Sequence, residues 1–274
     1  MRLTLVLLLL ASVFAHAYTQ TDIEYASVGE TALLLDLHTP SGLKQPPLIV
    51  YVHGGAWRAG SKSDVPIAGL IDHGFAIASV DYRLSTQARF PAQIHDIKAA
   101  IRFLRAKAST FGINTEKIAI IGSSAGGHLA ALVGVTNGHR ELEGRVGDHL
   151  DQRSDVNTIV SFYGASNLQS ILGQSTEFGL TVRIPALKLL LGDVPEKVPA
   201  LAKLASPVAH LDKQDPPLLL LHGDAYPQMP HAQSVEFQKA YQAKVRLITL
   251  PGSKHGGDEF YDAEHLRLVA DFLR

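Results

Sequence analysis

A pentapeptide set between an apolar run and a segment of small residues most constrains how this chain can fold. The run at 118–121 reads Ile-Ala-Ile-Ile, the pentapeptide at 122–126 reads Gly-Ser-Ser-Ala-Gly, and Gly-His-Leu-Ala-Ala-Leu follows. The first pattern predicts a strand and the last a helix. A Gly-x-Ser-x-Gly sequence between them is typical of a sharp turn with the serine at its apex. We interpret Ser124 as a candidate nucleophile, and an ordinary glycine-serine turn is the alternative.

Further apolar runs alternate with helical patterns along the chain. An opening hairpin is predicted at 23–27 and 31–38, and a polar turn at 114–116 leads into the serine strand. Other predicted strands cover 47–52, 74–82, 156–163, 216–221 and 245–250. Predicted helices begin at Pro91, cover 231–243 and close the chain from about Glu259. The alternation predicts an α/β fold, with a mostly parallel central sheet and helices on both faces.

The length of the chain bounds the number of domains, and its net charge bears on which partners it can bind. The chain has 274 residues, of which 46% are hydrophobic, which is enough for one sizeable core. Because no long polar linker interrupts the sequence, we expect a single domain over 18–274. The net charge of −1 gives no broad basic surface, so nucleic acid is not an expected partner.

The first seventeen residues resemble a secretory signal. A basic start at Met1-Arg2 is followed by a short apolar run at 3–14 and by Ala15-His16-Ala17. We expect cleavage before Tyr18, export to the periplasm or the medium, and no stable membrane span afterwards. A buried N-terminal helix or an uncleaved anchor is the alternative.

Cysteine is absent, which excludes disulfides, thiol catalysis and cysteine-based metal sites. The sequence also shows no His-x-x-x-His pair and no carboxylate cluster with metal spacing. We therefore expect neither a metal nor another cofactor.

A serine hydroxyl needs a base to take its proton. His255 is the candidate, because it lies in a glycine-flanked loop after the last predicted strand. A surface histidine is the alternative, since the chain has 13 histidines. Ligands of such sheets bind beyond the carboxyl ends of the strands, where both residues are expected.

The oxyanion of an acyl-transfer intermediate needs backbone N–H donors. Ala125, directly after the serine, is one candidate, and the Gly54-Gly55 pair that follows a predicted strand supplies the others. A plain turn is the alternative for the glycines. Trp57 in the same loop is a candidate substrate-binding residue, or it packs the loop.

These residues belong to a series of motifs that resembles the α/β-hydrolase-fold carboxylesterases. The likeness runs from about residue 31 to the C-terminus and is strongest to the feruloyl-esterase-like and acetyl-esterase-like branch, related to the hormone-sensitive-lipase and prolyl-oligopeptidase-like groups. It is carried by the motifs at 53–62, 81–84, 90–93, 96–100, 122–130, 206–207, 215–217, 222–224 and 255–257. The resemblance implies structural roles for Asp96, Arg83 and His128.

The sequence departs from these relatives at the acid of the triad. Where they read His-Gly-Asp-x-Asp-Pro, this chain has Tyr226 in place of the second aspartate. The alternative position after the preceding strand carries Asn167. Asp224 is the provisional acid, two residues early, and Asp258 and Glu259 lie on the loop of the histidine itself.

The resemblance implies a secreted serine hydrolase that cleaves carboxylic esters through an acyl-enzyme. The expected substrates are small acyl esters of the acetyl or feruloyl type, as small molecules or linked to carbohydrate, and a cap-like insertion at about 168–206 would shape their site. Two alternatives remain: an inactive or weakly active hydrolase-fold binding protein, and an amide hydrolase resembling an aryl-formamidase or an exopeptidase.

Overall fold

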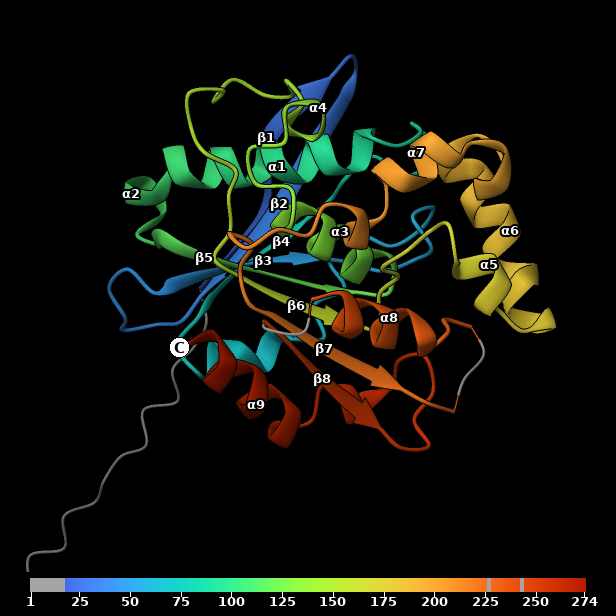
Figure 1. The fold of residues 1–274 in the computed structure, drawn as a ribbon. Coiled ribbons are helices and arrows are strands. Elements are labelled where there is room, and N and C mark those ends of the chain that lie inside the picture. Colours follow the sequence, from blue (N-terminus) through green and yellow to red (C-terminus); the bar gives the residue numbers. More distant parts are fainter. Residues whose placement is uncertain (1–17, 226–227, 242–243) are drawn as a thin grey trace, which may run out of the picture.

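The computed structural model describes residues 18–225, 228–241 and 244–274. One sheet of eight strands, in the order β1-β2-β4-β3-β5-β6-β7-β8, runs through these residues (Figure 1). The strands are β1 (Tyr18–Val28), β2 (Thr31–Thr39), β3 (Pro47–Val52), β4 (Ala76–Val80), β5 (Asn114–Ser123), β6 (Thr158–Phe162), β7 (Leu218–Gly223) and β8 (Val245–Leu250). The pairs β1–β2 and β2–β4 are antiparallel and all other pairs are parallel. The predicted fold class is confirmed.

Helices fill the connections between the strands. The α-helices are α1 (Ala92–Ala106), α2 (Ala108–Phe111), α3 (Ala125–Gly134), α4 (Arg140–Glu143), α5 (Ile171–Gln174), α6 (Glu177–Leu191), α7 (Pro199–Leu204), α8 (Ala232–Ala240) and α9 (Ala263–Leu273). Short 3₁₀ helices are η1 (Ala68–Ile71), η2 (Pro195–Lys197), η3 (Pro207–Ala209) and η4 (Asp258–Phe260). The segment predicted as a cap-like insertion, 168–206, contains α5, α6, η2 and α7, which lie beyond the arrowheads of the strands (Figure 1).

Two stretches named in the sequence lie outside the described residues: the predicted signal segment 1–17, and Tyr226. Among the described helices, none combines the length and the apolar character that a bilayer span requires.

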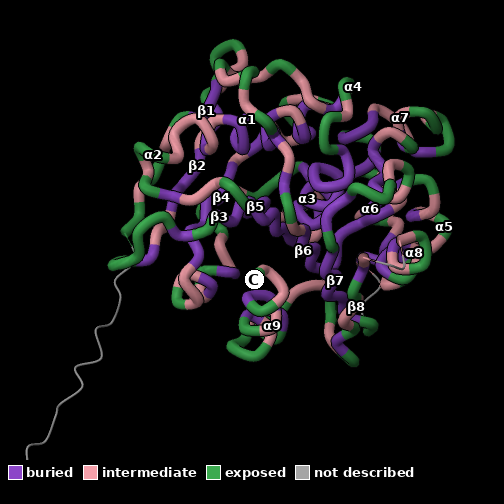
Figure 2. Tube along the Cα trace, turned by 60° about the vertical axis from the view of Figure 1, so that its left-hand side comes forward, coloured by how far each residue is buried: buried purple, intermediate pink, exposed green. Residues whose placement is uncertain are grey.

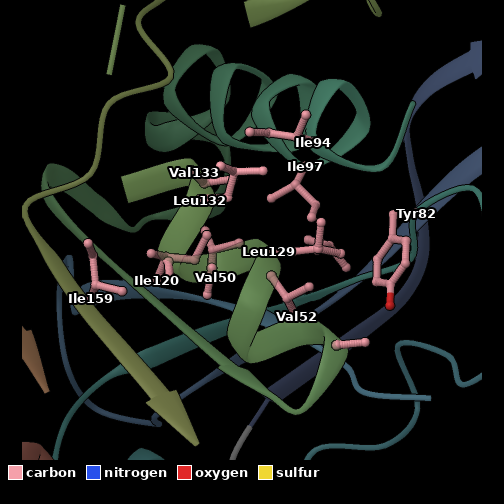
Figure 3. Close-up of a cluster of buried hydrophobic side chains, with 14 of the residues drawn as sticks. Val50, Val52, Tyr82, Ile94, Ile97, Ile120, Leu129, Leu132, Val133 and Ile159 are labelled. Carbon is pink, nitrogen blue, oxygen red and sulfur yellow. The ribbon is translucent and has the colours of Figure 1, made fainter. Parts of the chain in front are cut away.

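The central strands β3 to β7 are buried on both faces of the sheet over most of their length, which explains their continuous apolar runs, whereas the edge strand β1 is mostly exposed. Successive side chains of a strand point to opposite faces. Val50 and Val52 therefore face the core under α1 and α3, with Ile97 and Leu129 (Figure 3). The intervening Ile49 and Tyr51 face the second core, under η1 and α9. Figure 2 shows the central strands and α3 as buried, while α9 and the hairpin that contains β1 also carry exposed residues.

The polar turn predicted to precede the serine strand at 114–116 lies inside β5. Asn114 pairs with Pro47, and the next pair is Leu48 with Ile118, so the register shifts between them. The side chain of Asn114 accepts the N–H of Glu116 at 2.9 Å, which closes a local turn inside the strand. The sequence pattern correctly indicated a turn, but the ladder continues across it as a bulge.

An ion pair fixes the loop after β4 beside the site. Asp96 of α1 is fully buried and accepts hydrogen bonds from the backbone N–H, Nε and Nη2 of Arg83. Two residues on, the N–H of Ser85 donates to the carbonyl of Trp57 at 2.7 Å. The pair therefore holds the loop that in turn holds residues 53–57.

Candidate active site

Ser124 lies at the apex of a strained turn between β5 and α3. Its φ of 55° and ψ of −115° place a non-glycine residue in a region that is rarely occupied. A Cβ on Gly122 would collide with the carbonyl of Gly126, and one on Gly126 with the carbonyl of Val52. The N–H of Ser124 donates to the carbonyl of Phe162 at 2.8 Å. Neighbouring backbone thus holds the serine in position.

His255 meets the serine from the loop after β8. Its Nε2 lies 2.8 Å from Oγ of Ser124, within hydrogen-bond distance. The ring packs edge-on against Tyr163, with ring centroids 4.7 Å apart. The two residues are 131 positions apart in the sequence, and the structure brings them together as predicted.

A cavity of about 540 Å³ opens over this pair. Such a volume suits a small organic ligand. Its lining combines backbone from the loop after β3, side chains from the sheet edge and residues of α6 and the loop after β7. They include Gly54, Gly55, Arg58, Asp64, Tyr163, Val182, Gln228 and Tyr261, together with Ser124 and His255.

The candidate oxyanion donors lie around the serine. Gly54 and Gly55 line the cavity, and a Cβ on Gly54 would come within 3.0 Å of the carbonyl of Ser123. Gly55 has a φ of +104°, which favours glycine. Ala125 is the first residue of α3, where the backbone N–H has no partner within the helix.

Trp57 is not among the residues that line the cavity. Its side chain is 0% exposed, and its indole N–H donates to Nδ1 of His128 at 3.1 Å. Of the two roles considered for Trp57, this geometry supports packing of the loop and does not support substrate contact. His128 and Asp96 are also fully buried, and their hydrogen bonds join segments of the fold: His128 bonds to Trp57 and Ala205, and Asp96 bonds to Arg83.

Asp224 does not reach His255 in this structure. It is exposed, and its Oδ1 accepts the N–H of Gly252 at 2.7 Å. Asn167 is bound to Glu236 on α8. Within the described residues, Nδ1 of His255 is buried and has no hydrogen-bond partner. The assignment of Asp224 as the acid stays a prediction that this arrangement does not support.

The surroundings of His255 oppose its protonation. Burial, and then the positive charge of Arg183 and the neighbouring His222, lower the pKa of His255 to about 3. In a triad, a carboxylate stabilises the imidazolium that forms when the serine loses its proton. Here the charged group with the largest effect on His255 is Arg183, whose positive charge opposes protonation.

A chain of hydroxyl groups forms one wall of the cavity. Oγ of Ser123 lies 3.0 Å from the hydroxyl of Tyr51 and 2.7 Å from that of Tyr261, which lies 2.6 Å from that of Tyr163. All four residues line the cavity. Burial raises the pKa of Tyr51, Tyr163 and Tyr261, so these phenols stay neutral. Sequence reasoning missed this group, because its members come from four separate segments.

Among the residues that the structure describes, no group of three or more His, Asp or Glu side chains is placed to hold a metal ion.

A serine after β5 and a histidine after β8, meeting at the carboxyl edge of a mostly parallel sheet, follow the chain order of the α/β-hydrolase fold. Comparison with known proteins places the chain in that fold class. Within it, the chain belongs to the BD-FAE family, whose model matches residues 35–241.

Solved structures and curated proteins show similar chains. A truncated form of a carbohydrate esterase from gut microbiota is 33% identical, with a TM-score of 0.85, covering 96% of this chain and 97% of that one. Esterase 2 of Thermogutta terrifontis with propionate bound is 25% identical, with a TM-score of 0.74, covering 94% and 93%. Esterase LipC of Mycobacterium tuberculosis is 29% identical over 238 residues, covering 84% of this chain and 58% of LipC. The chain spans less than two thirds of the length of such curated relatives.

Proposed function

We propose that the protein is a serine hydrolase that cleaves carboxylic esters through an acyl-enzyme. The observation that carries the proposal is the 2.8 Å approach of Nε2 of His255 to Oγ of a strained Ser124. The serine attacks the ester carbonyl while His255 takes its proton, and His255 then gives that proton to the leaving alcohol. Water then attacks the acyl-enzyme while His255 takes its proton, and His255 returns that proton to Oγ of Ser124 as the carboxylic acid leaves.

The oxyanion of each tetrahedral intermediate needs donors that are free. The N–H of Ser124 is already bound to the carbonyl of Phe162, so it does not contribute. We assign this role to the N–H of Ala125 and to the backbone of Gly54 and Gly55, which borders the cavity.

Small acyl esters of the acetyl or feruloyl type are the proposed substrates, free or linked to carbohydrate. The cavity volume fits such groups, and its hydroxyl wall of Tyr51, Ser123, Tyr163 and Tyr261 offers hydrogen bonds to oxygen-rich ligands. The similarity to a carbohydrate esterase and to an esterase with bound propionate supports this class.

A weakly active or binding-only protein is the second candidate. It is favoured by one observation, the buried Nδ1 of His255 without a partner in the described part of the chain. Loss of the triad acid costs on the order of ten-thousandfold in serine proteases but leaves measurable catalysis. An amide hydrolase is the third candidate and uses the same serine and histidine.

One panel of assays separates the three candidates. The purified protein is treated with a fluorophosphonate probe and assayed on acetyl, butyryl and feruloyl esters, an aryl formamide and an aminoacyl amide. Labelling and ester turnover that both disappear in Ser124→Ala support the esterase. Absence of labelling in folded protein supports the binding protein, and preference for the formamide or amide supports the third candidate.

We also propose that the protein is exported, on the basis of the basic and apolar start followed by Ala15-His16-Ala17. N-terminal sequencing of the native protein is expected to begin at Tyr18. An intact Met1 on a cytosolic protein would overturn the proposal.

A further inference from the structure

Two buried groups beside the cavity have hydrogen-bonding atoms without partners in the described part of the chain. One is Nδ1 of His255. The other is the guanidinium of Arg183 on α6, whose Nη1 and Nη2 are both buried and unpartnered. The side chain of Arg183 is 0% exposed. A buried cation without a counter-ion is costly, so an arginine in this state needs an explanation.

The fold places these groups on the same side of the site. Nε of Arg183 donates to the carbonyl of Gln228 at 2.9 Å. Gln228 lines the same cavity as His255, and so does Val182, the neighbour of Arg183 along α6. The charge of Arg183 acts on His255 strongly enough to lower its pKa, second only to burial. Arg58 at the cavity adds a further positive charge near Arg183.

The tautomer of His255 that catalysis requires leaves a buried donor without an acceptor. For Nε2 of His255 to accept the serine proton, its own proton must reside on Nδ1, which is then a buried N–H donor without an acceptor. A guanidinium presents two parallel N–H groups that match the two oxygens of a carboxylate. One small carboxylate would thus satisfy both buried groups at once.

We propose that a small carboxylate anion of the formate or acetate class binds between Arg183 and Nδ1 of His255 and serves as the acid of the triad. The anion accepts a hydrogen bond from Nδ1–H, which stays on the ring, so it fixes the productive tautomer and stabilises the imidazolium, and it forms no covalent bond. The inference rests on the proposed esterase function. Its ligand is either a free carboxylate or the carboxylate that ester cleavage itself releases.

Sodium formate is the probe, with sodium chloride at equal ionic strength as the reference. Hydrolysis of a butyryl ester by the wild-type protein should rise about tenfold or more with formate, reach saturation, and not respond to chloride. Added butyrate should have the same effect as formate if the released acid also binds. A butyrate response that is absent limits the site to smaller free carboxylates.

Arg183→Met should abolish the formate response, and Arg183→Lys should keep part of it, because a lysine retains the charge without the fork. Arg105→Met is the matched control, since Arg105 is a mostly buried arginine bound to the carbonyls of Thr115 and Asp155 away from the cavity. It should keep the full fold-increase with formate. Circular dichroism checks that each variant is folded.

Binding is also measured without turnover, in Ser124→Ala labelled with ¹⁵N at histidine. Formate should shift the Nδ1 resonance of His255, and Arg183→Met in the same background should remove the shift. Ester turnover that is equal in formate and chloride, together with an unmoved resonance, overturns the anion site while the esterase stands. A formate-dependent shift in a protein that labels with no fluorophosphonate overturns the esterase and leaves the anion site.

Discussion

Trp57 donates its indole N–H to Nδ1 of His128 across 3.1 Å, and both side chains are fully buried. Because Nδ1 accepts this bond, Nε2 carries the ring proton and donates it to the carbonyl of Ala205 at 2.7 Å. A single imidazole therefore joins three segments: the glycine loop after β3, the helix that follows the nucleophile, and the end of α7.

His128→Ala should lower the free energy of unfolding by about 2–4 kcal/mol, since it leaves a buried N–H and a buried carbonyl unpaired and opens a cavity. Urea denaturation measures the change. His231→Ala, at a partly exposed histidine with one side-chain bond to Thr249, is the control and should cost less than about 1 kcal/mol. Equal midpoints for His128→Ala and the wild type would show that the imidazole does not join these segments energetically.

Ser124→Ala and His255→Ala should each reduce kcat for the best ester by at least about a thousandfold, because the two side chains transfer one proton as a unit. Ser123→Ala is the matched control. It removes the bonds to Tyr51 and Tyr261 but no reacting atom, and it should stay within about tenfold of the wild type. If Ser123→Ala abolishes activity and Ser124→Ala does not, the assignment of the nucleophile is wrong.

Asp224→Asn should change kcat by less than about threefold, since an amide oxygen can still accept the N–H of Gly252. Tyr226→Asp restores the carboxylate of related sequences and should raise kcat by at least about tenfold. Position 226 lies outside the described residues, so this expectation rests on the sequence alone. A large loss in Asp224→Asn would instead mean that Asp224 orients His255 during turnover.

In the pH profile of kcat/KM, the loss of activity on the acid side, the acid limb, should occur at an unusually low pH. The pKa of His255 is about 3, against an ordinary value of 6.5, so the free enzyme keeps a neutral base below pH 6.5. Arg183 and His222 oppose its protonation, Tyr163 packs on its ring, and Arg58 and Asp64 line the cavity.

We expect kcat/KM to hold level down to about pH 5 in short assays without carboxylate buffers. Arg183→Gln should move the limb upward, because it removes a positive charge. A limb near pH 6.5 that does not respond to Arg183→Gln would contradict the assigned electrostatics.

Acid should also destabilise the fold. Burial lowers the pKa of His128 and of His222 to about 4 and that of His255 to about 3, whereas all three titrate near 6.5 when the chain unfolds. Below about pH 6.5 the unfolded state therefore binds more protons than the folded state. The contribution of these histidines to the free energy of unfolding is fully present above about pH 6.5 and declines as the pH falls toward 4. Each histidine should cost about 2 kcal/mol between about pH 7 and pH 5.

Asp215 acts in the opposite direction, since burial raises its pKa to about 6. Urea denaturation at a series of pH values measures the balance, and the slope should flatten above pH 7. A constant free energy of unfolding between pH 7 and pH 5 would show that the three buried histidines do not dominate its pH dependence.

The parts of the fold that follow from local pattern were predicted well. The strand at 245–250 has the predicted limits, and the antiparallel hairpin of β1 and β2 was expected from two short runs around Gly29-Glu30. The turn at Ser124 was predicted from Gly122 and Gly126, two residues on either side. The structure shows the reason for these glycines, since a Cβ on either would collide with neighbouring backbone. These features depend on neighbouring residues, which a sequence displays directly.

Other parts depend on contacts between distant segments. Helix α6 was not predicted, because it contains Pro185 and because its apolar residues do not follow one face. Nothing in the sequence around Arg183 indicates that its guanidinium is buried near a histidine 72 positions later. The sequence around Trp57 likewise does not show that its indole N–H donates to His128, the contact that identifies Trp57 as a packing residue.

The chain of hydroxyl groups from Tyr51 through Ser123 and Tyr261 to Tyr163 is reversible, since either atom of each pair can be the donor. In one orientation all O–H bonds point toward Tyr163, which then has a proton left to donate. In the other they point toward Tyr51, and Tyr163 keeps only lone pairs to offer. Concerted rotation of four hydroxyls, without movement of any heavy atom, thus converts this wall of the cavity from a donor to an acceptor. One binding site can in this way accommodate a carbonyl oxygen in one ligand and a hydroxyl proton in the next.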